Sequence, residues 1–199
     1  MKTKKGFTLL ELLIVIGILA ILSTTMILVI NPAELLKKAR DSQRMSDLST
    51  VKTAIAYYLT NASTISMGST ITTYSSLGDA TNVKCGSWTT GSATSTQSVD
   101  GTGWIPISFS GLSGGSPIGG LPRDPNQSAY NGNPTLYYVY LASATTTNGF
   151  ELVANLESTY YTSGTTNAES TDGGKMITLY EVGSSFDLAT SSTTCFPSP

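Results

Sequence analysis

Hydrophobic positions in this 199-residue chain are concentrated near the N-terminus. Residues 7–30 have the sequence FTLLELLIVIGILAILSTTMILVI, with Glu11 as the single charged residue. A helix of this length measures roughly 36 Å, which exceeds the hydrocarbon core of a bilayer, about 30 Å thick. A secretory signal has a shorter apolar core followed directly by a small-residue cleavage site, and no such site follows here. The pattern therefore predicts a membrane helix that stays on the protein.

At residue 31 the pattern changes from uniformly apolar to amphipathic. Asn31 can cap a helix, and Pro32 suits the first helical position, so we expect a helix restart or a kink at these two residues. Apolar residues then recur at spacings of three and four, which predicts one buried stripe on a helix over residues 31–62. The stripe consists of Leu48, Val51, Ile55, Tyr58 and Ala62. The charged residues between 34 and 47 fit either a solvated helix face or a contact between subunits.

Three later segments are rich in β-branched and aromatic residues, as strands are. They span residues 136–143, 149–156 and 175–182. In the second segment apolar residues alternate with others such as Glu151 and Asn155, which predicts one buried face. Residues 104–121 carry enough apolar side chains to fold back onto the core. We therefore expect an α+β fold, with an antiparallel meander of about three strands laid across the amphipathic helix.

Charge and composition divide the chain in the same way. Residues 1–52 contain eight basic and four acidic residues, whereas the rest contains three and nine. The chain has no histidine, which excludes Ser-His-Asp and Cys-His nucleophiles and histidine-ligated metals. The basic stretch 37–44 lacks interleaved aromatic residues, so direct nucleic-acid binding is not supported. We expect neither an enzyme nor a bound cofactor.

A local motif opens the apolar segment. A leader containing Lys2, Lys4 and Lys5 precedes the sequence GFTLLEL, which starts at Gly6. This combination resembles the class III signal of type IV pilins and pseudopilins. The resemblance implies a leader peptide of residues 1–6, cut by a prepilin peptidase between Gly6 and Phe7. It also implies that Phe7 becomes the N-methylated terminus of the mature protein.

Glu11 lies five positions into this expected mature chain. An acidic side chain near the end of a membrane helix can extend to the interface, which is one interpretation. The other is that Glu11 pairs with the charged amine of Phe7 on a neighbouring subunit and sets the register of assembly. The flanking motif favours the second interpretation.

A further resemblance lies in the second half of the chain. Residues 121–125 have the pattern Leu-Pro-x-Asp-Pro, and paired tyrosines and the sequence FEL follow. This order is similar to major pseudopilins of type II secretion, over residues 104–157. The family implies a pilin fold, with 7–30 as transmembrane and assembly helix and 31–62 as amphipathic helix. The two halves would form one long helix, whose amphipathic half packs on a small antiparallel β-sheet head, residues 63–199, outside the cytoplasm.

The implied function is that of a structural subunit of a type IV pilus-like filament. The subunit would be a single-pass membrane protein before assembly and part of a cell-surface filament afterwards. Its partners would be other copies, minor pilins, the prepilin peptidase, an assembly ATPase and an inner-membrane platform. One alternative is a pseudopilin of a type II secretion or competence (DNA-uptake) system. Another is a bitopic membrane-anchored binding module.

The resemblance also bears on the two cysteines and on calcium. An extracytoplasmic domain is oxidised, so we expect Cys85 and Cys195 to form a disulfide that pins the C-terminal region. Two free thiols are the alternative. Some major pseudopilins bind calcium in a C-terminal loop, and Asp172 lies in such a loop. The loop lacks a carboxylate cluster or EF-hand spacing, so calcium is an alternative that the sequence does not favour.

Overall fold

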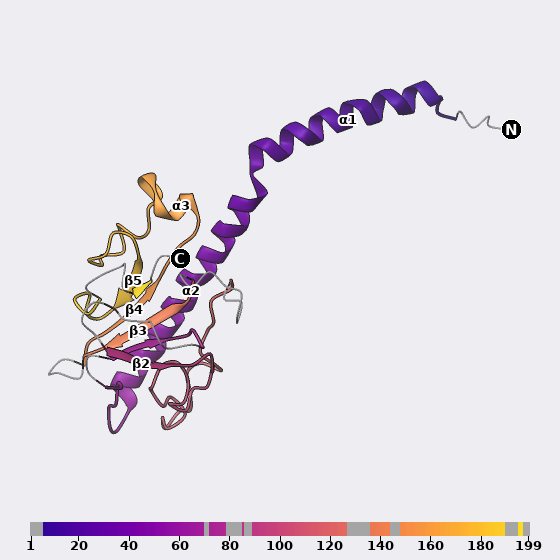
Figure 1. Cartoon of the computed structure of the whole chain (residues 1–199). Helices are drawn as coiled ribbons and strands as arrows, with labels where there is room; N and C mark the ends of the chain where they lie inside the picture. The colour runs from indigo at the N-terminus through magenta and orange to yellow at the C-terminus, as the bar shows by residue number, and fades with distance from the viewer. Residues whose placement is uncertain are drawn as a thin grey trace.

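The computed structural model describes residues 6–69, 72–78, 85, 89–126, 136–143, 148–189 and 195–196. Two long helices dominate this part of the chain, α1 (Leu9–Ile30) and α2 (Pro32–Asn61). Helix α1 extends away from the rest of the molecule, whereas α2 lies along the sheet of the head (Figure 1). The predicted α+β fold, with its long apolar N-terminal helix, is confirmed.

The described residues of the head contain one sheet, with the strand order β2-β1-β3-β4-β5. Its strands are β1 (Thr72–Ser75), β2 (Thr89–Ala93), β3 (Tyr138–Ala142), β4 (Phe150–Ala154) and β5 (Tyr180–Gly183). The pairs β1–β3, β3–β4 and β4–β5 are antiparallel, whereas β2 at the edge of the sheet pairs parallel with β1. Two short elements follow β4, namely α3 (Thr159–Thr162) and the 3-10 turn η1 (Gly164–Thr166).

The strand predictions are wrong in two details. All five residues of β4 are buried, including Glu151, so the expected single buried face is incorrect. The reason is that α2 covers one face of the sheet and segments near the C-terminus cover the other. The last strand begins only at Tyr180, because a turn closed by the Leu179 N–H on the Met176 carbonyl (3.2 Å) precedes it.

Two hydrophobic cores lie on the two faces of the sheet. The inner core joins α2 to the sheet and to residues 104–121, as the sequence predicts; its members include Leu48, Val51, Ile55, Tyr58, Trp104, Ile105, Ile107, Phe109, Tyr138, Tyr140 and Leu152. The outer core forms beneath residues 172–179, residues 184–189, Cys195 and Phe196, which we call the outer cover. Side chains of β3 and β4, such as Val139 and Val153, complete it.

Candidate functional site

Helix α1 begins with a reciprocal capping arrangement between Thr8 and Glu11. The N-cap residue Thr8 accepts a hydrogen bond on Oγ1 from the Glu11 N–H at 3.2 Å. The Glu11 carboxylate accepts in turn from the Thr8 N–H at 3.3 Å and from its hydroxyl at 3.1 Å. These bonds satisfy N–H groups that a helix start leaves free. The Thr-x-x-Glu spacing is the sequence signal by which this capping box is recognisable.

Gly6 and Phe7 precede the helix and are both exposed, with Phe7 85% accessible. A side chain at Gly6 would meet no atom within 4 Å. The peptide bond between the two residues therefore lies in open, non-helical backbone, as a protease substrate requires. The rest of the predicted leader, with Lys2, Lys4 and Lys5, lies outside the described residues.

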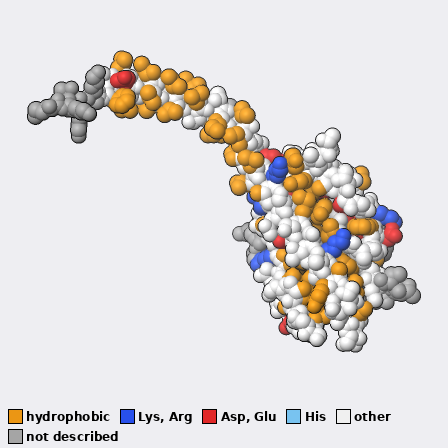
Figure 2. All heavy atoms as spheres, turned by 180° about the vertical axis from the view of Figure 1, so that it is seen from behind, with side chains coloured by type: hydrophobic (Ala, Val, Ile, Leu, Met, Phe, Trp, Pro, Cys, Tyr) orange, Lys and Arg blue, Asp and Glu red, His pale blue; other side chains and the backbone are white. Residues whose placement is uncertain are grey.

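The rest of the chain leaves the side chains of α1 almost completely uncovered (Figure 2). Among its described large apolar residues, the exposed fraction runs from 44% at Ile30 to 84% at Val29. The stretch Leu9–Ile27 is long and apolar enough to cross a membrane, and none of it is buried. A continuous apolar surface of this size needs lipid or another protein around it.

A single residue, Asn31, separates α1 from α2. Its φ of 44° and ψ of 76° are left-handed, so Asn31 ends the first helix and starts the second. Its side chain accepts the Glu34 N–H at 3.4 Å, and Pro32 occupies the first position of α2. Asn tolerates this backbone region better than most residues, and Pro needs no N–H partner at a helix start. Together the two residues redirect the chain from α1 into α2.

A cluster of ion pairs, which we call the α2 clamp, joins α2 to the head. It consists of Arg40, Asp41, Arg44, Asp124 and Glu157. The Arg44 guanidinium donates to Asp124 at 2.7 and 2.9 Å, and it pairs with Asp41 at 2.6 Å. Glu157 lies 2.8 Å from the same guanidinium and also accepts two hydrogen bonds from Arg40. Arg44 thus connects α2 to two distant segments of the head.

The clamp also holds backbone groups at the end of the sheet. Asp41 accepts from the N–H groups of Glu157 at 3.1 Å and of Ser158 at 2.8 Å. Asp41 and Arg44 have no exposed surface, so a solvated helix face is the wrong interpretation for these two residues. The sequence pattern does not reveal the cluster, because Asp124 is 80 residues from Arg44 and no local spacing relates them.

The electrostatics of the clamp favour its charged state. Burial disfavours the Arg44 cation, but hydrogen bonds to Asp124, Glu157 and Asp41 outweigh burial and raise its pKa. Burial likewise opposes ionisation of Glu157, and the hydrogen bonds from Arg40 and Arg44 lower its pKa below the usual value. Each charge of the clamp is therefore stable only while its partners stay in place.

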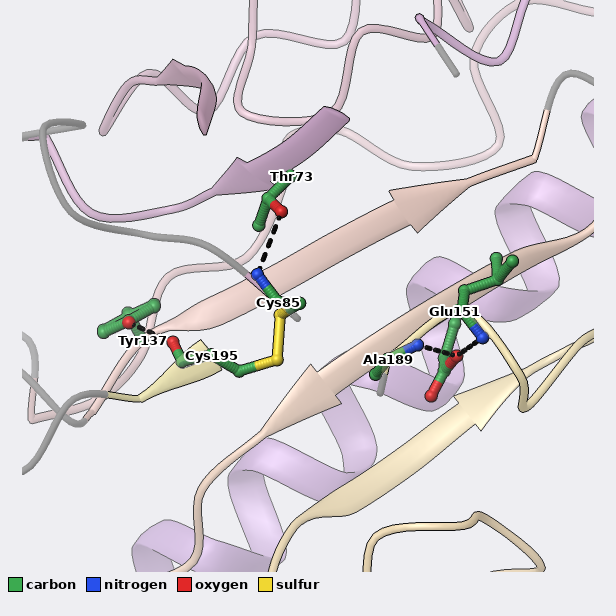
Figure 3. Close-up of a disulfide and its surroundings, with 7 residues drawn as sticks. Thr73, Cys85, Tyr137, Glu151, Ala189 and Cys195 are labelled. Carbon is green, nitrogen blue, oxygen red and sulfur yellow. Dashed lines mark hydrogen bonds between the residues drawn. A yellow bond between two sulfur atoms is a disulfide. The ribbon is translucent and has the colours of Figure 1, made fainter. Parts of the chain in front are cut away.

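On the other side of the sheet, Cys85 and Cys195 form a disulfide that closes a separation of 110 residues (Figure 3). The Tyr137 hydroxyl donates to the Cys195 carbonyl, and the Cys85 N–H donates to Thr73 at 3.3 Å. Both cysteines are completely buried. The bond therefore fastens the end of the outer cover to the sheet.

The Asp172 loop uses its carboxylate within the chain. One oxygen accepts the Gly174 N–H at 2.8 Å, and the other accepts the Glu181 N–H at 2.6 Å. Among the described residues, no group of three or more His, Cys, Asp or Glu side chains is placed to hold a metal ion.

Comparison with known proteins identifies the N-terminal segment. The family model of the prokaryotic N-terminal methylation motif matches residues 1–27. No curated protein and no solved structure matches the chain. The matched residues contain Gly6, Phe7 and Glu11 and extend over most of α1. Such a motif implies processing by a prepilin peptidase. The chain therefore carries the class III signal and the apolar N-terminal helix that are typical of prepilin-like proteins.

Proposed function

We propose that this chain is the structural subunit of a type IV pilus-like filament, made as a prepilin and cut between Gly6 and Phe7. The observation that carries the proposal is α1, which stays exposed along its length while α2 packs on the head. Lipid surrounds α1 before assembly, and the α1 helices of other copies replace lipid in the filament. The head lies outside the cytoplasm, where a disulfide between Cys85 and Cys195 persists.

Glu11 sets the register between subunits in this proposal. Within one chain its described contacts all go to Thr8, which follows Phe7 directly. The capping box thus holds the carboxylate beside the terminus that cleavage creates. A positive amine on Phe7 of another copy is attracted to this carboxylate more strongly in an apolar surrounding than in water. Subunits joined at this pair are fixed along the filament axis.

The remaining parts of the proposed cycle follow from the family. The prepilin peptidase removes residues 1–6 and methylates Phe7, and the apolar helix (residues 7–30) holds the mature subunit in the membrane. An assembly ATPase and an inner-membrane platform move copies, with minor pilins, into the filament. The protein acts mechanically in this cycle and catalyses no step. A pseudopilin of a type II secretion or competence system would use the same residues in a shorter filament.

The substitution Glu11→Gln tests the register, because glutamine still accepts the Thr8 N–H but carries no charge. We expect cleavage and membrane insertion to remain, an N-methylated Phe7 by mass spectrometry, and strongly reduced filament formation by electron microscopy. The control is Thr8→Ala, which removes the hydroxyl of the capping box but keeps the charge of Glu11. This control should assemble.

Two results would contradict the proposal at different points. Normal filaments from the Glu11→Gln variant would show that the charge does not set the register. An intact Met1 terminus in cells with an active prepilin peptidase would exclude processing after Gly6. Filament length in the wild type separates a surface pilus from the short filament of a secretion or uptake system.

A further inference from the structure

Two acidic residues on the outer face of the sheet are completely buried, Glu151 on β4 and Glu181 on β5. In the strand register Glu151 is opposite Gly183, and Glu181 is opposite Val153. Both carboxyl groups therefore leave the sheet on the same face, on adjacent strands and two positions apart. That face is covered by the outer cover and not by α2. Buried charges of the same sign this close need a compensating group.

The outer cover supplies backbone donors to both carboxyl groups. Glu151 accepts from the N–H groups of Leu188 and Ala189, each at 2.9 Å (Figure 3 shows Ala189). Glu181 accepts from the Met176 N–H at 2.7 Å. In each residue these bonds go to Oε2, and Oε1 has no hydrogen-bond donor from the described protein groups. One oxygen of each carboxyl group thus holds the cover, and the other oxygen has no donor among the described groups.

A proton on one of the two carboxyl groups would supply this donor. The side chains of Glu151 and Glu181 leave the same face of adjacent strands, two positions apart, and both are completely buried, so their carboxyl groups are neighbours. Two ionised carboxylates have only acceptors, so a hydrogen bond between them requires a proton on one of them. Burial, and then the neighbouring Glu181 carboxyl group, raise the pKa of Glu151 to about 9. Glu151 therefore keeps its proton at neutral pH.

The charged groups around the pair do not replace that proton. Lys175 attracts Glu151, but its ammonium is bonded to Asp187 at the exposed surface. Asp172 accepts the Glu181 N–H and adds another negative charge on the same side. Among the described residues around the pair, the cation Lys175 is therefore already paired, and Asp172 and Asp187 are two further carboxylates.

We propose that Glu151 and Glu181 share one proton and form a proton-dependent latch, which holds the outer cover on the sheet beside the disulfide between Cys85 and Cys195. Loss of the proton leaves two buried negative charges, and the cover opens so that water can reach them. The inner core and α2 keep their packing when this happens, because they lie on the opposite face. This device is independent of the filament role.

The sign of the pH dependence follows from the protonation of the pair. In the opened cover Glu151 regains an ordinary pKa near 4.5, below its value of about 9 in the closed cover. Opening therefore releases a proton between these two values, and the latch weakens as the pH rises through this window. One released proton increases the opening equilibrium up to about tenfold for each pH unit.

Amide hydrogen exchange of the full chain in detergent micelles tests the latch, with the disulfide intact. Rates are measured by mass spectrometry from pH 6 to 8.5 and divided by the intrinsic exchange rate at each pH. We expect the opening equilibrium of residues 184–189 to increase by up to about tenfold for each pH unit, while that of α2 shows no such increase. In Glu151→Gln the amide accepts the Leu188 and Ala189 N–H groups and donates to Glu181, so this increase should disappear.

Two further variants keep the test decisive. Glu181→Gln removes the second charge and should also flatten the pH dependence, which covers the case that Glu151→Gln fails to fold. Asp100→Asn changes an exposed carboxylate outside the cover, whose described side-chain hydrogen bonds go to Thr102, and should keep the wild-type slope. A flat wild-type profile would overturn the proposal. So would a wild-type slope that persists in the folded glutamine variants.

Discussion

Helices α1 and α2 are separated by one residue, yet they have opposite surroundings (Figure 1). Every described side chain of α1 is exposed, and the hydrogen bonds of its described side chains stay within the helix and its N-cap. Helix α2 buries a stripe of apolar residues against the sheet. It also buries Asp41 and Arg44 within the α2 clamp. The apolar side chains of α1 thus need lipid or another protein to cover them, whereas the apolar stripe of α2 is covered by the chain itself.

This difference separates two kinds of substitution. A change in α2 alters contacts that exist in the single chain, so it should change the free energy of unfolding of the head. A change in α1 removes apolar surface that only lipid or another copy can cover, so it should act on insertion or assembly. Unfolding of the head in variants of each helix tests this division.

The largest expected effect comes from the cation of the α2 clamp. Arg44→Ala leaves Asp41, Asp124 and Glu157 facing one another without their common partner. Removing one member of a buried ion pair costs about 3–5 kcal/mol. We expect a loss of stability of this size in urea unfolding followed by tryptophan fluorescence, since Trp104 is buried in the inner core.

The matched control for this prediction is Arg40→Ala. Arg40 contacts the same Glu157, but 29% of its side chain is accessible, and exposed pairs contribute about 1 kcal/mol or less. An Arg44 variant that is no less stable than the Arg40 variant would show that the clamp does not hold the head on α2.

The same substitution, leucine to alanine, made once in each helix tests the difference between α1 and α2 directly. Leu48 is completely buried on α2, whereas Leu13 on α1 is 61% exposed. Leu48→Ala should reduce stability by about 2–5 kcal/mol, because it removes buried methyl groups and leaves a cavity. Leu13→Ala should change unfolding of the head by no more than about 0.5 kcal/mol. Urea midpoints of both variants in the same detergent give the comparison.

For filament assembly we expect the reverse order of effects, given the proposed role of α1. Leu13→Ala should weaken filaments while leaving the isolated head unchanged. Equal losses of head stability in the Leu13 and Leu48 variants would mean that α1 packs on its own chain in solution.

Features that depend on one local segment could be predicted from the sequence, whereas features that depend on distant segments could not. Helix α1 was predictable from the length of its apolar run, because no other part of the chain is needed to explain it. The apolar stripe of α2 and the restart at Asn31 and Pro32 are also local patterns, and residues three or four apart carry them. The capping box of Thr8 and Glu11 is equally local, and its spacing is visible in the printed sequence.

The buried charges could not be predicted in this way. Arg44 and Asp41 are polar residues on an amphipathic helix, a pattern typical of a solvated face. Their burial depends on Asp124 and on residues after β4, which only the tertiary fold brings near. The prediction of one buried face around Glu151 was wrong for a related reason, since alternation in a strand assumes that water covers the polar face. Here the outer cover replaces water and supplies N–H donors to the carboxylate.

The smallest expected effect lies at the boundary between the two helices. Asn31 has a left-handed backbone and caps α2 through the Glu34 N–H. Asn31→Ala loses this cap and strains the backbone, for a cost of about 1–2 kcal/mol, whereas Asn31→Gly loses the cap without strain and should cost a few tenths. Urea unfolding measures both. Spin labels at Ser23 and Ser49 report the distance between the helices, which we expect Asn31→Ala to shift and Asn31→Gly to broaden. Unchanged stability and distance in the alanine variant would mean that the surroundings of α1 and α2, and not Asn31, fix the bend.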